Sequence, residues 1–270
     1  MSGYSQTFLG DIWPWEVDST EHFTVSRYYQ KFQSASWRYL HQHGVDPAGA
    51  RTTAALTLYK SELRVRDVFR VETGLVEAGN RPVLGHRVVN VDNGAVCTEM
   101  LQYLEGVTLD GPTLPWDGGT WETRPAPDPD TRWMRSAMTV VRMDEADWNG
   151  AMSFECLIQN FSSANTQVMA TFGLTPDYLT RERVGLSTFE FQLEVGTLAR
   201  PGDPIDIDSC LAHLGGSSMR FCHRMTNART GEHIADLSQF GVHLDLDARR
   251  PSRIPDHLRE RARNILAGPD

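Results

Sequence analysis

The chain has 270 residues, of which 40% are hydrophobic and 23% are charged, a composition that is ordinary for a globular protein large enough to hold two domains. Its formal net charge of −9 at pH 7 argues against nucleic acid or an anionic membrane surface as the main partner. No apolar run approaches the roughly 18 residues of a transmembrane helix, and the N-terminus has no basic region followed by an apolar one, so neither a membrane span nor a signal peptide is expected.

The cysteines indicate a reducing compartment. They lie in predicted strands and a predicted helix and have no CxxC spacing. We therefore expect reduced, structural thiols in a cytoplasmic protein, with no zinc or other metal site. The four residues are Cys97, Cys156, Cys210 and Cys222.

One stretch of the chain occurs twice. Residues 18–44 and 147–173 align without a gap at an offset of 129, and each has an acidic residue, a polar step and an apolar-periodic run that ends in glycine. This pattern predicts a loop that leads into a long helix with a glycine C-cap. The identical pairs are Asp18/Asp147, Gln30/Gln159, Phe32/Phe161, Ser34/Ser163, Ala35/Ala164 and Gly44/Gly173.

The similarity continues downstream at a different offset. Asp67 and Gly79 are matched by Asp203 and Gly215, 136 residues later. The change from 129 to 136 implies seven extra residues in the second copy, which we place near 197–201. Two units of about 100 residues indicate a duplicated domain, with an unrelated α+β pair as the alternative.

Each copy predicts one long helix followed by four strands. The first has an extended aromatic lead-in at 4–17, a helix at about 24–43 and strands at 52–65, 67–76, 82–91 and 95–104. The second has a strand at 138–143, a helix at about 153–172, strands at 186–195, 204–214, 218–227 and 233–246, and a closing helix at about 255–266. Short turns between the strands predict antiparallel sheets, each with one face covered by its helix.

The segment between the two copies has the composition of a linker. Residues 107–132 contain Pro112, Pro115, Pro125, Pro127 and Pro129 together with several glycines and aspartates. We expect this segment to be irregular and to connect rather than to catalyse. The predicted domains are therefore residues 1–106 and 133–270.

The residues before each helix resemble a known family. Residues 15–24, Trp-Glu-Val-Asp-Ser-Thr-Glu-His-Phe-Thr, are similar to the loop before the helix of hot-dog-fold acyl-CoA thioesterases, the 4-hydroxybenzoyl-CoA thioesterase-like superfamily, where an Asp is followed by Gly-His. Residues 141–152 look like the same signature, and 200–203, Arg-Pro-Gly-Asp, resemble a strand–turn–strand element of that family. The first copy has Glu21 in place of the glycine, and the second has Ala151 in place of the histidine.

This resemblance implies both a fold and a substrate. The fold is α+β, with two tandem hot-dog domains, each an antiparallel sheet wrapped round a long helix. The two domains would form a pseudo-dimer within one chain, because the family often works as a dimer. The implied partner is an acyl-CoA substrate, with coenzyme A as part of that substrate and no separate cofactor. Such double hot-dog protomers can also form homo-oligomers.

Two aspartates are the candidates for catalysis. Asp18 and Asp147 precede helix N-termini, where backbone N–H groups and the helix dipole can polarise a thioester carbonyl. A carboxylate there can serve as general base or as nucleophile, although Asp is also a common cap before a helix. We favour Asp147, because Asn149 and Gly150 beside it bring a side-chain amide and bare backbone close to a substrate.

Three further residues are candidates with weaker support. His22 can orient a carbonyl or hold a water molecule, or it can be structural. Thr24, at the start of the first helix, is a candidate for substrate binding. Arg200 is a candidate for contact with a coenzyme A phosphate, with a solvated turn charge as the alternative. No Ser–His–Asp arrangement can be identified, which disfavours a serine triad.

The predicted function is hydrolysis of an acyl-CoA or a related acyl thioester. One alternative is a hydratase or dehydratase on the same fold, although the Pro-Gly expected after His22-Phe23 is missing. The other alternative is a non-catalytic acyl-CoA or lipid binder that keeps only the groove. Turnover of acyl-CoA, as opposed to mere retention, distinguishes the enzyme from the binder.

Overall fold

The computed structural model describes residues 3–77 and 82–266. Backbone contacts divide the chain into two compact units, of which the first is Met1–Trp121 with Ser153–Ile158 and the second is Glu122–Met152 with Gln159–Asp270. In the part of the chain that the structure describes, no helix is long and apolar enough to cross a membrane.

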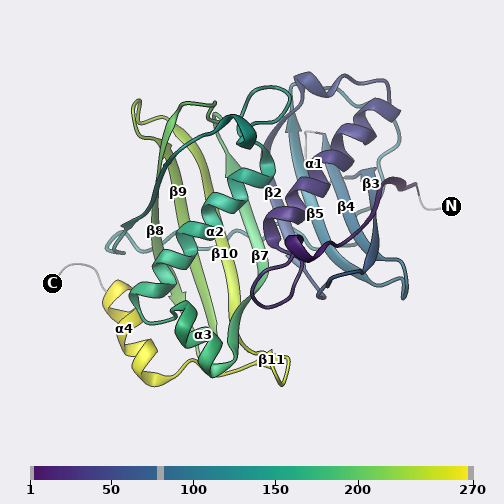
Figure 1. Cartoon of the computed structure of the whole chain (residues 1–270). Coiled ribbons are helices and arrows are strands. Elements are labelled where there is room, and N and C mark those ends of the chain that lie inside the picture. The colour runs from purple at the N-terminus through teal and green to yellow at the C-terminus, as the bar shows by residue number, and fades with distance from the viewer. Residues whose placement is uncertain (1–2, 78–81, 267–270) are drawn as a thin grey trace. The chain divides into compact units, whose positions relative to one another are not determined.

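The first unit is an antiparallel sheet with one long helix on one face (Figure 1). The strands pair in the order β1-β3-β4-β5-β2. The apolar-periodic run predicted for this helix forms its buried face, because Tyr28, Phe32, Ala35 and Leu40 are all buried. The elements are β1 (Ser5–Asp11), η1 (Pro14–Glu16), α1 (Val25–Gln42), η2 (Pro47–Gly49), β2 (Arg51–Tyr59), β3 (Val68–Leu75), β4 (Val83–Asn90) and β5 (Val96–Glu105).

The second unit repeats this order. Its strands pair in the order β7-β10-β9-β8-β6, and β11 pairs with β10. One core cluster joins α2 to the sheet and to α4 through Val168, Phe172, Phe221 and Leu258. The elements are β6 (Met134–Val140), η3 (Met143–Glu145), α2 (Phe154–Thr171), α3 (Pro176–Glu182), β7 (Val184–Val195), β8 (Pro204–Leu214), β9 (Ser218–Asn227), β10 (His233–Asp245), β11 (Arg250–Pro251) and α4 (Asp256–Leu266).

The duplication is confirmed. Both long helices have 18 residues and begin 129 positions apart, at Val25 and Phe154. Strands β3 and β8 begin 136 positions apart, at Val68 and Pro204. One helix and its antiparallel sheet, repeated in the same order, make two tandem hot-dog units. The pseudo-dimer arrangement stays a prediction.

The position predicted for the seven extra residues was wrong. The offset is still 129 at the helix C-terminus, where Val45 N donates to Leu40 O and Leu174 N donates to Met169 O. The extra residues lie before β7 and not at 197–201, because α3 begins 129 positions after η2, at Pro176 and Pro47, and is longer than η2. Thr175 caps α3 by accepting a hydrogen bond from Tyr178 N at 3.2 Å, and a proline opens the helix.

Predicted strand boundaries also differ from the structure, and the strand predicted at 138–143 is β6, Met134–Val140. The lead-in at 4–17 contains a true strand, β1, which pairs with β3. The predicted strand at 52–65 ends at Tyr59, and the chain then turns before β3, with Arg66 in the left-handed region at φ 73°. Gly79, used in the sequence alignment, lies outside the described residues.

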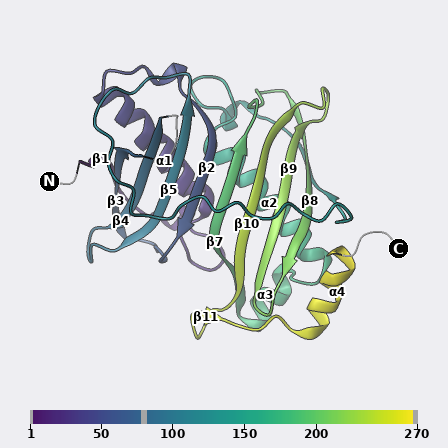
Figure 2. The same cartoon turned by 180° about the vertical axis from the view of Figure 1, so that it is seen from behind.

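The segment between β5 and β6 packs on the sheets. Figure 2 shows it crossing the sheet faces opposite the long helices. In the first unit, Leu114, Trp116 and Trp121 pack against a cluster of buried residues on β2, β4 and β5. In the second unit, Arg124 donates two hydrogen bonds to Glu190, at 2.8 and 2.7 Å. The segment therefore covers apolar surface as well as connecting the copies.

Arg124→Met is expected to lower the free energy of unfolding by about 1–3 kcal/mol, because it leaves the Glu190 carboxylate, 10% exposed, without its bidentate partner. Urea unfolding measures this loss. Glu122→Gln is the matched control, since Glu122 is 73% exposed and 3.8 Å from Arg124, and it should change stability by less than about 0.5 kcal/mol. Equal stabilities for the two variants would contradict a role of the pair in holding the segment.

Candidate functional site

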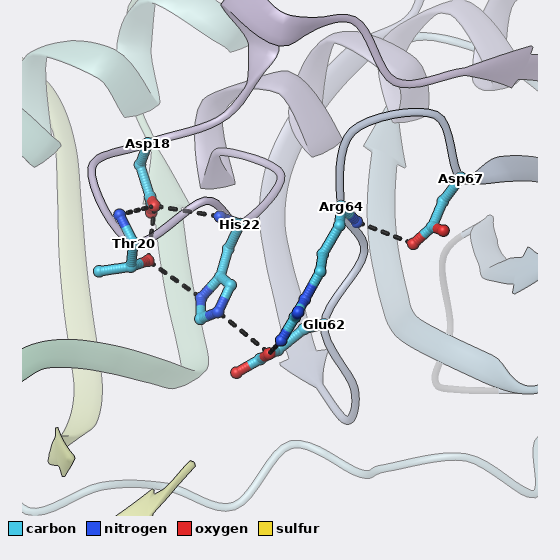
Figure 3. Close-up of polar contacts among 6 residues, drawn as sticks. All are labelled: Asp18, Thr20, His22, Glu62, Arg64 and Asp67. Atoms are coloured by element: carbon cyan, nitrogen blue, oxygen red, sulfur yellow. Dashed lines mark hydrogen bonds and ion pairs between the residues drawn. The ribbon is translucent and has the colours of Figure 1, made fainter. Parts of the chain in front are cut away.

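The loop before α1 is closed around Asp18 (Figure 3). Asp18 Oδ1 accepts hydrogen bonds from Thr20 N at 2.8 Å, from the Thr20 hydroxyl at 2.5 Å and from His22 N at 3.3 Å. The backbone adds two bonds, from Asp18 N to His22 O at 2.9 Å and from Glu21 N to Asp18 O at 3.0 Å. Asp18 thus shapes the loop, as an Asx turn does.

The loop before α2 has the same backbone pattern. Asp147 Oδ1 accepts from Asn149 N at 2.9 Å. Asp147 N donates to Ala151 O at 2.8 Å, and Gly150 N donates to Asp147 O at 2.9 Å. The structural role of the aspartate is therefore common to both copies, and any chemical difference must come from the surrounding side chains.

The fourth residue of each loop has a left-handed backbone. Gly150 has φ 71° and Glu21, at the matching position, has φ 64°. Glycine adopts this conformation freely, whereas a residue with a Cβ is strained by roughly 1–2 kcal/mol. The departure of Glu21 from the family pattern is therefore a local strain in the first loop.

Glu21→Gly is expected to raise the free energy of unfolding by up to about 1 kcal/mol, since relief of this strain outweighs the entropy that glycine adds to the unfolded chain. Ser19→Gly is the control in the same loop. Ser19 is not among the residues with positive φ, so glycine there should cost about 0.5–1 kcal/mol. Chemical denaturation of both variants tests the sign, and destabilisation by Glu21→Gly would contradict the strain.

The first loop also carries a histidine that links two carboxylates (Figure 3). His22 Nδ1 lies 3.0 Å from the Thr20 hydroxyl oxygen. On the other side, His22 Nε2 lies 3.0 Å from Glu62 Oε2, as an ion-pair contact rather than an aligned hydrogen bond. Arg64 Nη2 lies 3.1 Å from the same Glu62 oxygen. The row therefore runs from Asp18 through Thr20 and His22 to Glu62.

The hydroxyl proton of Thr20 sets the direction of the hydrogen bonds along this row. The Thr20 hydroxyl has one proton and donates it to Asp18. His22 Nδ1 must then supply the proton in its contact with Thr20. His22 Nε2 faces the Glu62 carboxylate at 3.0 Å, so the ring lies between the two acidic residues.

The second loop lacks this row. Ala151 is at the position of His22, and Leu198 is at the position of Glu62 at the offset of 136. Asn149 contributes its backbone N–H to Asp147. A Cβ built at Gly150 would lie 3.8 Å from Arg200 Nη1, so the exposed Arg200 does lie beside this loop.

Arg200 has a counterpart in the first unit. The backbone N of Arg200 donates to Asp203 Oδ2 at 2.9 Å, and the backbone N of Arg64 donates to Asp67 Oδ2 at 2.8 Å. Both arginines therefore occupy equivalent turns, as expected if Arg200 is a charged residue in a solvated turn. The guanidinium of Arg64 also reaches Glu62.

The remaining candidate, Thr24, directly precedes α1. Its side chain makes no capping hydrogen bond, and its backbone N donates to Glu16 O at 2.9 Å. The first N–H groups of α1 have no acceptor within the helix and can face a substrate. Within residues 3–77 and 82–266, no group of three or more His, Cys, Asp or Glu side chains is arranged to hold a metal ion.

Sequence reasoning missed Thr20, Glu62 and Arg64. The spacing Asp-x-Thr-x-His was present as a signal for Thr20. For Glu62 the only signal was its place just before the turn at 64–67, which the offset of 136 aligns with 200–203. Asp18 and His22 lie together in the first unit, whereas Asp147, Asn149, Gly150 and Arg200 lie in the second.

The fold and these loops define a tandem hot-dog protein, and comparison with known proteins identifies its class. Residues 141–262 match the model of the thioesterase-like superfamily, which agrees with the resemblance seen in the sequence. The class of activity is thioester hydrolysis. No curated protein sequence matches the chain.

Solved structures resemble the chain over nearly its whole length. A putative oleoyl thioesterase from Lactobacillus plantarum has a TM-score of 0.66 and 11% identity, covering 88% of this chain and 96% of its own. The 12:0-ACP thioesterase from Umbellularia californica has a TM-score of 0.63 and 11% identity, covering 91% and 93%. An acyl-ACP thioesterase from Bacteroides thetaiotaomicron has a TM-score of 0.63 and 11% identity, covering 87% and 96%. At this identity the likeness shows the fold, and it confirms two tandem hot-dog units.

Proposed function

We propose that this chain hydrolyses an acyl thioester at the loop of the first unit. The observation that carries the proposal is the row from Asp18 through Thr20 and His22 to Glu62, which has acid–base groups where the second unit has Ala151 and Leu198. The preference for Asp147 rested on its sequence neighbours. The side-chain geometry of the two loops favours Asp18 instead.

Asp18 is the exposed carboxylate of the row. Within the described part of the chain, the hydrogen bonds of its side chain all go to Oδ1, which leaves Oδ2 to act on a substrate. This oxygen can take a proton from an attacking water molecule or attack the thioester carbon itself. The N–H groups at the start of α1 would stabilise the oxyanion, and water then completes conversion of the thioester to a carboxylic acid and a thiol.

His22 supports this chemistry as a positioning residue. Its side chain is 13% exposed and its Nε2 is enclosed, so it acts through its neighbours rather than on the substrate. Its Nδ1 contacts the Thr20 hydroxyl and its Nε2 lies 3.0 Å from the Glu62 carboxylate, so the ring holds Thr20 in place beside Asp18. Arg64 adds a cation beside Glu62.

The proposed substrate is an acyl-CoA, and an acyl group on a carrier protein is the second candidate. Acyl-ACP thioesterases from two organisms share the fold over nearly the whole chain, which supports including the carrier-bound thioester in any test.

The test is a panel of acyl-CoAs of varied chain length and aromaticity, with matching acyl-carrier-protein thioesters, assayed with a reagent for free thiols. We expect thiol release in proportion to the amount of enzyme. A hydratase would instead add water to a 2-enoyl-CoA without releasing thiol. A lipid binder would retain acyl-CoA unchanged. Retention without thiol release across the panel would overturn the proposal.

A further inference from the structure

A row of buried polar side chains crosses the helix-facing side of the first sheet. Thr7 Oγ1 lies 2.8 Å from Thr73 Oγ1, which lies in β3 beside β1. Thr73 Oγ1 is 2.8 Å from His86 Nδ1, and His86 Nε2 is 3.0 Å from Gln102 Oε1. Gln102 Nε2 then donates to Thr52 Oγ1 at 2.7 Å. The row is continuous over five strands.

The second sheet repeats the row with one break. Ser136 Oγ lies 2.6 Å from Ser209 Oγ, which lies 2.6 Å from His223 Nδ1. At the far end, Gln239 Nε2 donates to Thr188 Oγ1 at 3.0 Å. Within the described residues, His223 Nε2 has no hydrogen-bond partner, although His223 is only 1% exposed. The break therefore falls between His223 and Gln239.

In the first unit, a helix residue completes the row. Ser36 Oγ lies 3.4 Å from His86 Nε2 and also bonds to Gln102 Oε1. Phe32, one helical turn before Ser36, has its ring 5.5 Å from the His86 ring. The helix thus presents an aromatic ring and a polar side chain to the same histidine, as the i, i+4 spacing allows.

The second helix presents Asn165 in the same way. Phe161, one turn earlier, has its ring 5.8 Å from the His223 ring, and Asn165 occupies the position that Ser36 has in the first helix. Asn165 is 4% exposed, and in the described part of the chain its Oδ1 has no hydrogen-bond partner. Two buried polar atoms, Asn165 Oδ1 on α2 and His223 Nε2 on β9, are therefore left unpaired among the described residues. Such atoms are rare in folded proteins and cost about 1–3 kcal/mol each.

The directions of the hydrogen bonds along the second row show that His223 Nε2 is a hydrogen-bond acceptor. Ser136 donates its hydroxyl proton to Ile207 O at 3.0 Å, so Ser209 must donate to Ser136. His223 Nδ1 must then donate to Ser209, which leaves Nε2 of a neutral imidazole as an acceptor. Burial lowers the pKa of His223 to about 3, so the ring is neutral at physiological pH. His223 Nε2 and Asn165 Oδ1 are both acceptors and cannot bond each other.

We propose that the second unit contains a buried binding site for one small uncharged group with two hydrogen-bond donors, between His223 Nε2 and Asn165 Oδ1. Two donors satisfy both acceptors and close the break in the row. An ammonium ion is excluded, because Phe161 and Phe221 flank the histidine and desolvation would penalise a charge. A water molecule and a primary amide both have the required donors. The site does not depend on thioester hydrolysis.

Crystals of the full chain grown with and without acetamide test the site and distinguish a bound water molecule from a bound primary amide. We expect electron density within hydrogen-bond distance of both His223 Nε2 and Asn165 Oδ1. A single round peak under both conditions identifies water. Planar density that appears only with acetamide identifies an amide site. No density, or an Asn165 amide nitrogen bonded directly to His223 Nε2, would overturn the proposal.

Asn165→Leu tests the same site in solution. If a donor bridges the two atoms, this change lowers the urea midpoint and shifts the ¹⁵N resonance of His223 Nε2. Gln167→Ala, at an exposed position on the same helix, is the matched control and should move neither. If Asn165 Oδ1 is an unpaired acceptor instead, its removal raises the midpoint and leaves the resonance in place, and the proposal fails.

Discussion

Asp18→Asn is expected to lower the turnover of an acyl thioester by on the order of 10²-fold or more, the usual effect of losing a general base or nucleophile. Asparagine keeps the size of the side chain and an oxygen for the Thr20 N–H, but it removes the negative charge at Oδ2. Binding of the acyl thioester should survive, so the loss should appear in kcat rather than in KM.

Asp147→Asn is a matched control, because Asp147 makes the same turn bonds in a loop of the same shape. It should cost less than Asp18→Asn, since Ala151 and Leu198 give the second loop no acid–base row. If Asp147→Asn is inactive and Asp18→Asn active, the site lies in the second copy, as the sequence neighbours of Asp147 suggested. Full activity in the double variant would remove the carboxylate mechanism altogether.

The duplicated fold could be predicted because its markers are local. An aspartate before a helix and a glycine after it are fixed by turn and capping geometry, so Asp18/Asp147 and Gly44/Gly173 survive at a constant offset. Helix α3 could not be predicted in the same way. Its 7 residues are too few for a helical period, and only its capping threonine and the proline after it mark it in the sequence.

Only some residues of the candidate site could be predicted from the sequence. Asp18 and His22 were found because they flank one turn. Glu62 was missed because the fold, not the sequence, brings it to within 3.0 Å of His22. The choice between the two copies therefore depended on Asn149 and Gly150, which are neighbours in sequence, while the residue that distinguishes the loops comes from the connection after β2.

The buried polar rows were missed for a related reason. His86 and His223 each stand in a strand that also contains arginine, so a polar residue there is as compatible with an exposed position as with a buried one. Their partners come from other strands and from the helix, so the sequence of one strand carries no signal for the row.

These two histidines should make the protein sensitive to acid. Burial lowers the pKa of His86 to about 4, with a smaller opposing effect from its hydrogen bond to Gln102, and burial lowers that of His223 to about 3. In the unfolded chain both would titrate near 6.5. Below about pH 6.5 the unfolded state therefore binds protons that the folded state does not bind. The free energy of unfolding should fall as the pH drops through this range.

The size of the effect follows from the pKa differences. Each pH unit below about 6.5 removes roughly 1.4 kcal/mol per histidine until the folded group itself titrates, so the loss from the pair reaches several kcal/mol by about pH 4. The pKa of His243 is also lowered by burial and adds a loss of the same sign. Urea unfolding at a series of pH values between 7 and about 4.5 would measure the slope directly.

Histidine variants test whether the buried rows cause this dependence of the free energy of unfolding on pH. His86→Gln and His223→Gln each remove one titrating group, so both should be less stable at pH 7, yet each should lose less stability on acidification than the parent. His257→Gln, at an exposed position in α4, is the matched control and should leave the slope unchanged. A parent slope that persists in the double variant His86→Gln/His223→Gln would show that the slope does not come from the two buried histidines, and the neutral form assigned to His223 would then be wrong.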